Sequence, residues 1–344
     1  MNSISVPVLY YHRIGGADPQ HLSIPTDIFE KQMGFLKRSG YKSIFLHEFL
    51  DFLQGKQKES RKLVMITFDD GFRDNFENAH KVLKKFQLKA TIFGCSGLIR
   101  PEAQRPSEKA LSVSEAFSLA FRGDFSSFLS KSEMEKMYDS GVWEFQSHSH
   151  SHSQVFSGSK IESIFPEVDN HWGILSAYKD PLLRGSWPVF PRKSGLISQA
   201  FFPKIMEIRN NFPVNSLEKM RDFIGKELNI REYFQKEDEK AFELRVLKEL
   251  EESKHFFSGY HRKNVDGICW PWGKYSRDLI ELAKKVGYKA AFTTQSGVNS
   301  SGTSPFEIKR FPIKKLSQFR FVLGVWLRSH AVLAKIYGRL RAKF

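Results

Sequence analysis

Apolar and polar residues follow two alternating patterns along the chain. Short apolar runs rich in β-branched and aromatic residues, most of them ending at glycine or a polar residue, predict buried strands. They cover residues 6–11, 62–71, 89–96, 142–147, 265–273 and 288–294. Between them, apolar residues recur on one face of longer segments, which predicts amphipathic helices. These helices are expected at residues 27–40, 75–88, 131–141, 239–257 and 276–287.

The alternation of strand and helix predicts an α/β fold with a parallel sheet, either a barrel or an open sheet. Two segments interrupt it: the serine-rich residues 100–130 and a long insertion at residues 155–235. Connections of this length inside an α/β domain are usually binding loops, lids or disordered segments. We therefore expect one domain over residues 1–315, with insertions at about 100–130 and 155–235, followed by a basic helix over residues 316–344.

Composition places the chain among globular proteins, with 41% hydrophobic and 26% charged residues in a length of 344. Two cysteines, Cys95 and Cys269, are too few for a disulfide framework or a cysteine-based zinc site. We expect two buried free thiols in a reducing compartment.

No signal peptide is seen, and no apolar run reaches the ~18 residues of a membrane span. The sequence therefore predicts a cytoplasmic location.

Positive charge is concentrated near the C-terminus. The net charge is +15, and residues 308–344 hold ten lysines and arginines but no carboxylate. Residues 319–344 resemble one amphipathic helix, with apolar residues Phe321, Val325, Leu333, Ile336 and Leu340. This helix either packs onto its own domain or adsorbs to an anionic membrane, which would place the protein peripherally at the inner membrane face. Nucleic acid is an unlikely partner, because no recognition motif accompanies the charge. Nothing in the sequence indicates an oligomeric state.

Candidate chemistry begins with Asp69 and Asp70, which directly follow a buried strand. Carboxyl ends of parallel strands converge on a ligand, and adjacent acids can divide metal binding from proton transfer. Three histidines, His148, His150 and His152, follow the strand at 142–147. Imidazoles suit zinc and similar metals. Alternation on a strand would put all three on one face, whereas a turn would pair His148 with His152. A solvated histidine-rich loop remains the alternative.

Several motifs together resemble the polysaccharide deacetylase family, also called carbohydrate esterase family 4 or the NodB-homology domain. They are TFDDG (67–71), HSHSH (148–152) and the later PWG (271–273). The stretches VLYYHRI, FLKRSGY, WEFQSHSHSH and KRFPI are similar to the permuted exopolysaccharide-deacetylase branch. The resemblance runs from Val6 to about Pro312. It implies a distorted (β/α)7-type barrel and metal-dependent removal of an acetyl group from an N-acetylated sugar.

The resemblance also assigns roles to individual residues. It makes Asp69 the general base, and His12 the general acid in place of the family's later Leu-x-His motif. It makes three residues the metal ligands: Asp70, His148 and His152. The metal would be divalent, with Zn²⁺ expected and Co²⁺, Ni²⁺ or Mn²⁺ as alternatives.

Two histidines stand outside this assignment. His150 has no role and is interpreted as an exposed spacer. His330 is a rival to His12 for the general acid.

One motif departs from the family pattern. Many members have an arginine that orients the base where this chain has Cys269, two residues before PWG. Arg310, in the KRFPI stretch, is the candidate to replace it. A backbone N–H of the PWG loop could stabilise an oxyanion. Aromatic and neighbouring residues could bind the sugar face. The substrate-binding candidates are Trp272, Pro271, Tyr11 and Trp270, and Tyr10 and Trp143 are further aromatic candidates.

Two functions from different classes follow. The first is a hydrolase of carbon–nitrogen bonds that removes an N-acetyl or related acyl group from an amino sugar of a cell-envelope polysaccharide or its lipid-linked precursor. The second is a non-catalytic, glycan-binding member of the same fold, suggested by the missing arginine and the long insertion. Retention of the whole set of proposed catalytic residues favours the enzyme, because a binding protein would not need all of them.

Overall fold

The computed structural model describes residues 4–16, 22–56, 62–153, 237–261, 264–314 and 317–330, with short pieces between 163 and 235. The chain divides into two compact units. The first comprises residues 1–112, 125–151 and 247–344, and the second comprises residues 113–124 and 152–246. Each is described by itself.

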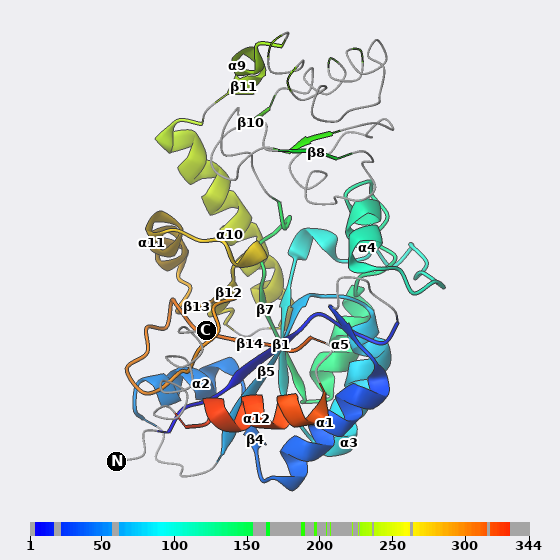
Figure 1. Ribbon diagram of the computed structural model, residues 1–344, viewed down its shortest axis with the longest axis vertical. Helices are drawn as coiled ribbons and strands as arrows, with labels where there is room; N and C mark the ends of the chain where they lie inside the picture. The colour runs from blue at the N-terminus through cyan, green and yellow to red at the C-terminus, as the bar shows by residue number, and fades with distance from the viewer. Residues whose placement is uncertain are drawn as a thin grey trace. The chain divides into compact units, whose positions relative to one another are not determined.

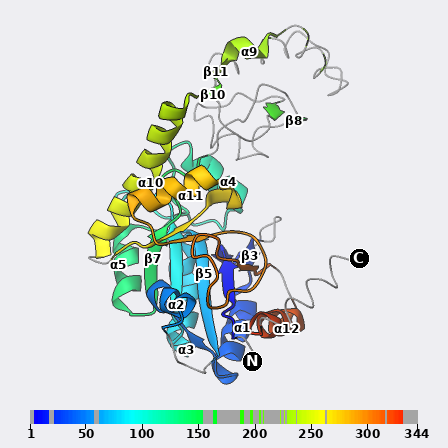
Figure 2. The ribbon, with the colours of Figure 1, turned by 90° about the vertical axis from the view of Figure 1, so that its left-hand side faces the viewer.

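A parallel sheet forms the centre of the first unit. Its strand order is β13-β12-β7-β6-β5-β1-β14, with β4 paired to β5, and the pairs are parallel. Figure 2 shows β5 and β7 side on, running in the same direction. The strands are β1 Val8–Tyr11, β4 Lys42–Ser43, β5 Leu63–Asp70, β6 Ala90–Gly94, β7 Trp143–Ser147, β12 Gly267–Cys269, β13 Ala290–Phe292 and β14 Phe311–Pro312.

The sheet curls towards closure through the segment that leads into β14. Ile308 forms a parallel bridge with Phe292 of β13, and Phe311 pairs with Leu9 of β1. The same short segment therefore contacts both edges of the sheet. The prediction of a distorted barrel is confirmed, and helices connect its successive strands as far as β13, whereas a loop leads from β13 to β14.

The predicted helices are present, with small changes at their ends. Helices α1, α3 and α5 lie along one side of the sheet in Figure 1. The segment at 75–88 begins with a π-helical turn, Asn75–Ala79, before α3. The helices of the first unit, with α10 crossing into the second, are α1 Thr26–Arg38, α2 Leu46–Leu53, α3 His80–Phe86, α5 Lys131–Asp139, α10 Glu239–His261 and α11 Arg277–Val286. Patterning did not predict α2, whose apolar residues join the core enclosed by the barrel.

The second unit contains α4 Val113–Ala120, a helix inside the serine-rich segment 100–130 that the patterning did not predict. It also contains two antiparallel strand pairs and a short helix: β8 Ser163–Phe165 with β9 Trp187–Val189, β10 Leu196–Ile197 with β11 Phe234–Gln235, and α9 Ile230–Tyr233. Most of the predicted insertion at 155–235 lies outside the described residues.

The C-terminal basic segment begins as helix α12, Gln318–Arg328, which lies beside α1 in Figures 1 and 2. Phe321 and Val325 are fully buried, and the ring of Phe321 meets that of Phe35 at 6.1 Å. Because α12 ends at Arg328, the prediction of one helix over 319–344 is wrong at Ser329. The predicted apolar residues Leu333, Ile336 and Leu340 lie outside the described residues. In the part of the chain that the structure describes, no helix has the length and apolarity needed to span a membrane.

Candidate active site

The carboxyl ends of three neighbouring strands bring the first candidate residues together. All eight residues of β5 are buried, and Asp69 and Asp70 are its last two. Asp70 pairs with Gly94 at the end of β6, and the N–H of His148, directly after β7, donates to the carbonyl of Gly94 at 2.8 Å. The backbone of Asp70 is left-handed, with φ 75°, a conformation that aspartate tolerates better than most residues. The strand therefore ends here, with both carboxylates at the rim.

The three predicted ligands form one buried cluster. The ligand atoms of Asp70, His148 and His152 all lie within 4.8 Å of one another. Nε2 of His148 is 3.3 Å from Oδ1 of Asp70. On the other side of the ring, Nδ1 of His148 lies 2.7 Å from the carbonyl oxygen of Cys269. Since a carbonyl can only accept, Nδ1 carries a proton, and Nε2 is the ring nitrogen that faces Asp70.

This cluster fits a divalent cation. One carboxylate and two imidazoles are a donor set that zinc and its neighbours accept, with positions left for water and substrate. Burial lowers the pKa of His148, but Cys269, Asp70 and Asp69 around it raise that pKa well above its ordinary value. The surroundings therefore stabilise positive charge at this point.

Asp69 is paired with Arg310, which reaches it from just before β14. Nη1 and Nη2 of Arg310 donate to the two carboxylate oxygens at 2.7 and 2.8 Å, and Nε donates to the carbonyl of Thr293 at 2.8 Å. Arg310 is 1% exposed. Burial raises the pKa of Asp69, but Arg310, His148 and His12 together lower it to about 2. Asp69 is therefore ionised at neutral pH.

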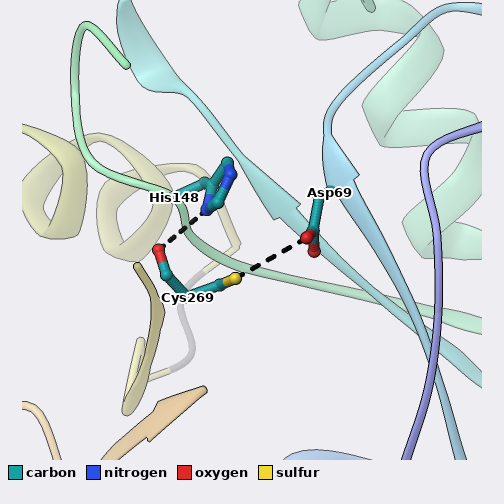
Figure 3. A group of neighbouring side chains, drawn as sticks. All are labelled: Asp69, His148 and Cys269. Atoms are coloured by element: carbon teal, nitrogen blue, oxygen red, sulfur yellow. Dashed lines mark hydrogen bonds between the residues drawn. The ribbon is translucent and has the colours of Figure 1, made fainter. Parts of the chain in front are cut away.

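Cys269 lies between Asp69 and His148, as Figure 3 shows. Its thiol donates to Asp69 Oδ2 at 3.7 Å, and its carbonyl oxygen accepts the His148 proton. Burial raises the pKa of this thiol, so it remains protonated at neutral pH. Cys269 also forms a compact group with Asp69 and His148. Because Arg310 occupies both oxygens of Asp69, that group is a poorer cation site than the one with Asp70. Cys269 and Cys95 are both buried and free, as predicted.

His12 follows β1 at the same rim, close enough to contribute to the low pKa of Asp69. The loop after the DDG turn holds this segment in place. Nδ2 of Asn75 donates to the carbonyl of His12 at 2.9 Å, and the carboxylate of Asp74 accepts from Arg13 Nε at 2.5 Å and from the N–H of Ile14 at 3.1 Å. Sequence reasoning did not find Asp74 and Asn75, although they stand only four and five residues after Asp70.

The rival acid, His330, lies elsewhere. It follows α12 and bridges Ile4, which precedes β1, whereas His12 follows the carboxyl end of that strand. His330 is therefore placed towards the opposite end of the barrel from Asp69. This position removes it as a candidate general acid.

Two predicted substrate contacts are wrong. Tyr11 is fully buried, stacks on Phe68 at 5.3 Å, and donates its hydroxyl to Gln32 at 2.9 Å. Trp270 is 3% exposed and presents no open ring face to a sugar. Trp143 is also in the core, at 2%.

Side chains alternate along a strand, so the neighbour of Tyr11 faces the other way. Tyr10 is the tyrosine at the site, with its ring 4.2 Å from the guanidinium of Arg310. Pro271 and Trp272 are half-buried in a tight turn directly after the strand that ends at Cys269, and Trp272 has φ 60°. These two remain available to a substrate.

His150 is not a simple exposed spacer. Its Nδ1 lies 2.9 Å from Ser96 Oγ, and its carbonyl accepts from the N–H of Gly97 at 2.8 Å. A side-chain atom at Gly97 would come within 3.0 Å of the His150 ring. The middle histidine thus packs against the turn that follows β6.

An arginine-paired aspartate beside an Asp-His-His cluster lies at the carboxyl ends of the strands, where parallel α/β barrel enzymes carry their active sites. The model of the polysaccharide deacetylase family matches residues 56–177. This matched segment contains the DDG turn and the histidine loop of the site.

Two relatives in sequence carry deacetylase names. Over 88 residues, 26% of this chain and 31% of its relative, the sequence is 42% identical to the putative polysaccharide deacetylase YxkH of Bacillus subtilis. It is 22% identical to the poly-beta-1,6-N-acetyl-D-glucosamine N-deacetylase of Staphylococcus aureus over 89% of this chain and 73% of that protein. This similarity is consistent with the exopolysaccharide-deacetylase branch.

Two solved structures share the fold at 17% identity. A de-N-acetylase from Aggregatibacter actinomycetemcomitans aligns with a TM-score of 0.60 over 93% of this chain and 99% of its own. The Streptococcus pyogenes deacetylase PplD, in complex with acetate, aligns with a TM-score of 0.58 over 94% and 98%.

Proposed function

We propose that this protein is a divalent-metal-dependent N-deacetylase, which hydrolyses the N-acetyl amide of an amino sugar in a cell-envelope polysaccharide or its lipid-linked precursor. The observation that carries the proposal is the pairing of buried, ionised Asp69 with Arg310 beside the Asp70-His148-His152 cluster. The poly-N-acetylglucosamine deacetylase of Staphylococcus aureus supports the substrate class.

Asp69 acts as the general base and takes a proton from the attacking water. Its two oxygens are fixed by Arg310, so the carboxylate keeps one orientation. Asp70, His148 and His152 would hold the cation. When bound, a divalent metal, with Zn²⁺ our choice, would polarise the amide carbonyl and lower the pKa of water.

His12 acts as the general acid and gives its proton to the leaving amine, without which an amide does not cleave. Asn75 holds the His12 carbonyl, which limits movement of this residue relative to β5. Pro271 and Trp272, half-exposed after β12, would contact the sugar.

The test is release of free amine from β-1,6-linked N-acetylglucosamine oligomers, with chelator-treated enzyme and with enzyme reloaded with Zn²⁺. We expect chelation to abolish turnover and zinc to restore it. A parallel assay on a lipid-linked N-acetylglucosamine precursor separates the two substrate forms. Turnover that survives both chelation and Asp70→Asn would contradict the proposal.

The alternative of a non-catalytic glycan-binding protein is not favoured. It depended in part on the missing motif arginine, and Arg310, just before β14, supplies a guanidinium to Asp69. Calorimetry with the same oligomers distinguishes the two functions, because a binding protein would show affinity without turnover after zinc is restored.

We also propose that α12 and the basic segment after it contact an anionic phospholipid surface. The outward face of α12 exposes three large apolar side chains at helical spacing: Phe319 at 74%, Leu323 at 36% and Trp326 at 44%. These differ from Phe321 and Val325, which the sequence suggested and which pack inward. Exposed Arg320 lies beside them, and residues 331–344 add four lysines and arginines with no carboxylate. Apolar and basic residues together are typical of interfacial helices.

Co-sedimentation of the full chain with phosphatidylglycerol-containing vesicles tests this contact, with pure phosphatidylcholine vesicles for comparison. We expect binding only to the anionic vesicles, and loss of binding in the triple variant Phe319→Gln, Leu323→Gln and Trp326→Gln. Leu244→Gln is the matched control, because Leu244 is 59% exposed on α10. Equal sedimentation of the triple variant and the wild type would refute the contact.

A further inference from the structure

The loop that follows β7 carries His148 and His152 but leaves the sheet after its first residue. Ser149 has φ 66° and His152 has φ 55°, a left-handed backbone that non-glycine residues adopt at a cost. Such a conformation persists only where surrounding groups hold it. The groups that hold this loop therefore decide where the two histidines lie.

One carboxylate on α10 accepts three hydrogen bonds from the middle of the loop. Oε2 of Glu249 accepts the backbone N–H of His150 at 3.1 Å and that of Ser151 at 2.8 Å. Oε1 of Glu249 accepts the hydroxyl of Ser151 at 2.6 Å. Both backbone donors lie between the two histidines in the chain. Glu249 thus satisfies two N–H groups that the sheet no longer pairs.

A second contact from the same helix fixes the start of the loop. Ser253, one helical turn after Glu249 and fully buried, lies 2.8 Å from Ser147 Oγ. Ser147 Oγ in turn accepts the N–H of Ser149 at 3.3 Å. The face of α10 that carries Glu249 and Ser253 therefore follows the loop from Ser147 to Ser151.

We propose that Glu249 is a positioning residue for the metal site: it sets the backbone between His148 and His152 and so presents both imidazoles to the cation. The proposal rests on the proposed function, since it takes these histidines as ligands. Outer groups that orient metal ligands typically contribute about 10–100-fold to metal affinity. Glu249 does so through the backbone of the ligand loop rather than through an imidazole ring.

Two substitutions separate the effect of the length of the Glu249 side chain from the effect of its charge. In Glu249→Gln the amide oxygen can still accept both N–H groups and the amide NH₂ can donate to Ser151 Oγ, so reach is kept and charge is lost. In Glu249→Asp the charge is kept, but the side chain is one methylene shorter. A positioning role predicts that the aspartate variant is the more damaged.

The experiment titrates Zn²⁺ into the chelator-stripped full chain, by calorimetry or by competition with a chromophoric chelator. We expect the zinc Kd of Glu249→Asp and Glu249→Ala to rise about 10–100-fold, and that of Glu249→Gln to stay within about threefold of the wild type. Glu251→Ala is the matched control, since Glu251 is exposed on the same helix. Melting curves of the apo proteins show whether each variant is folded.

The outcomes separate this inference from the proposed function. Wild-type protein that binds no zinc would refute the metal site itself. A wild type that binds zinc together with a Glu249→Asp variant of equal affinity would overturn the role of Glu249. Glu249→Gln as weak as Glu249→Ala would also overturn it, because charge rather than position would then be responsible.

Discussion

The end of β5 and the loop after β7 contribute to the same site but are held in different ways. Asp69 and Asp70 end a strand that is buried throughout and paired with β1 on one side and β6 on the other. His148 keeps one sheet hydrogen bond, and the residues after it depend on side chains of α10 and of the turn after β6. One half of the site is fixed by the sheet, and the other by a few polar contacts. Substitutions should therefore act differently on the two halves.

Asp69→Asn and Asp70→Asn should give the largest effects and should differ in kind. Loss of a general base lowers kcat by about 10²–10⁴-fold, so Asp69→Asn should lose turnover while zinc affinity changes little. Asp70→Asn should lose both. Amine release and zinc titration on the same preparations measure the two effects. Equal zinc affinities for the wild type and Asp70→Asn would mean that Asp70 is not a ligand.

Arg310→Met tests what the ion pair with Asp69 contributes to the half of the site at the end of β5. Removing one partner of a buried ion pair costs about 3–5 kcal/mol, so the free energy of unfolding should fall by that amount. Without the guanidinium, burial raises the pKa of Asp69 above the present value of about 2. A base with a raised pKa is protonated further up the pH scale, so the acid limb of kcat/KM should move to higher pH. Urea unfolding and a pH profile measure these two changes.

The double variant Arg310→Met with Asp69→Asn is the control for this prediction. It removes both charges of the pair, so it should recover part of the stability that Arg310→Met loses. If both proteins unfold at the same urea concentration, the ion pair is not the cause of the loss.

Ser96→Ala should lower zinc affinity less, because it changes only the loop after β7. It removes the contact with His150 Nδ1, and a single hydrogen bond contributes about 1 kcal/mol. We expect zinc affinity to fall by no more than about fivefold, with kcat at saturating zinc unchanged. A larger loss than that of Glu249→Asp would make the turn after β6, rather than α10, the main support of the loop.

Tyr11→Phe should have the smallest effect on function. It removes the hydrogen bond to Gln32 within the core, so the free energy of unfolding should fall by about 1 kcal/mol. Amine release should be unchanged, since Tyr11 has no exposed surface. A clear rise in KM would restore Tyr11 as a substrate contact.

The sequence predicted the residues at the strand ends but not the contacts that hold the loop after β7. The strand-end acids and the histidines are local features, and they stand where the alternation of strand and helix ends each strand. Glu249 could not be found this way, because it lies about 100 residues from the loop, on a helix where a glutamate looks like a surface residue. Its role depends on which helix packs beside the loop after β7, and this is a property of the tertiary structure rather than of the local sequence.

The error at Tyr11 has a different cause. Strands of a parallel barrel are buried on both faces, so the sequence shows no alternation of apolar and polar residues. Two consecutive tyrosines in such a strand must face opposite ways, but nothing in the run indicates which faces the site. Only the stacking of Tyr11 on Phe68 decides it.

Arg310 lies on the segment that brings the two edges of the barrel together. The ion pair with the catalytic base therefore forms only when this segment is in place. Asp69 is made early in synthesis, and its guanidinium partner emerges about 240 residues later. Until that last segment docks, the carboxylate lacks the guanidinium that contributes most to keeping it ionised inside the barrel. A chain that stops before Ile308 would lack both the closing bridge and a working base, so turnover itself reports that folding is complete.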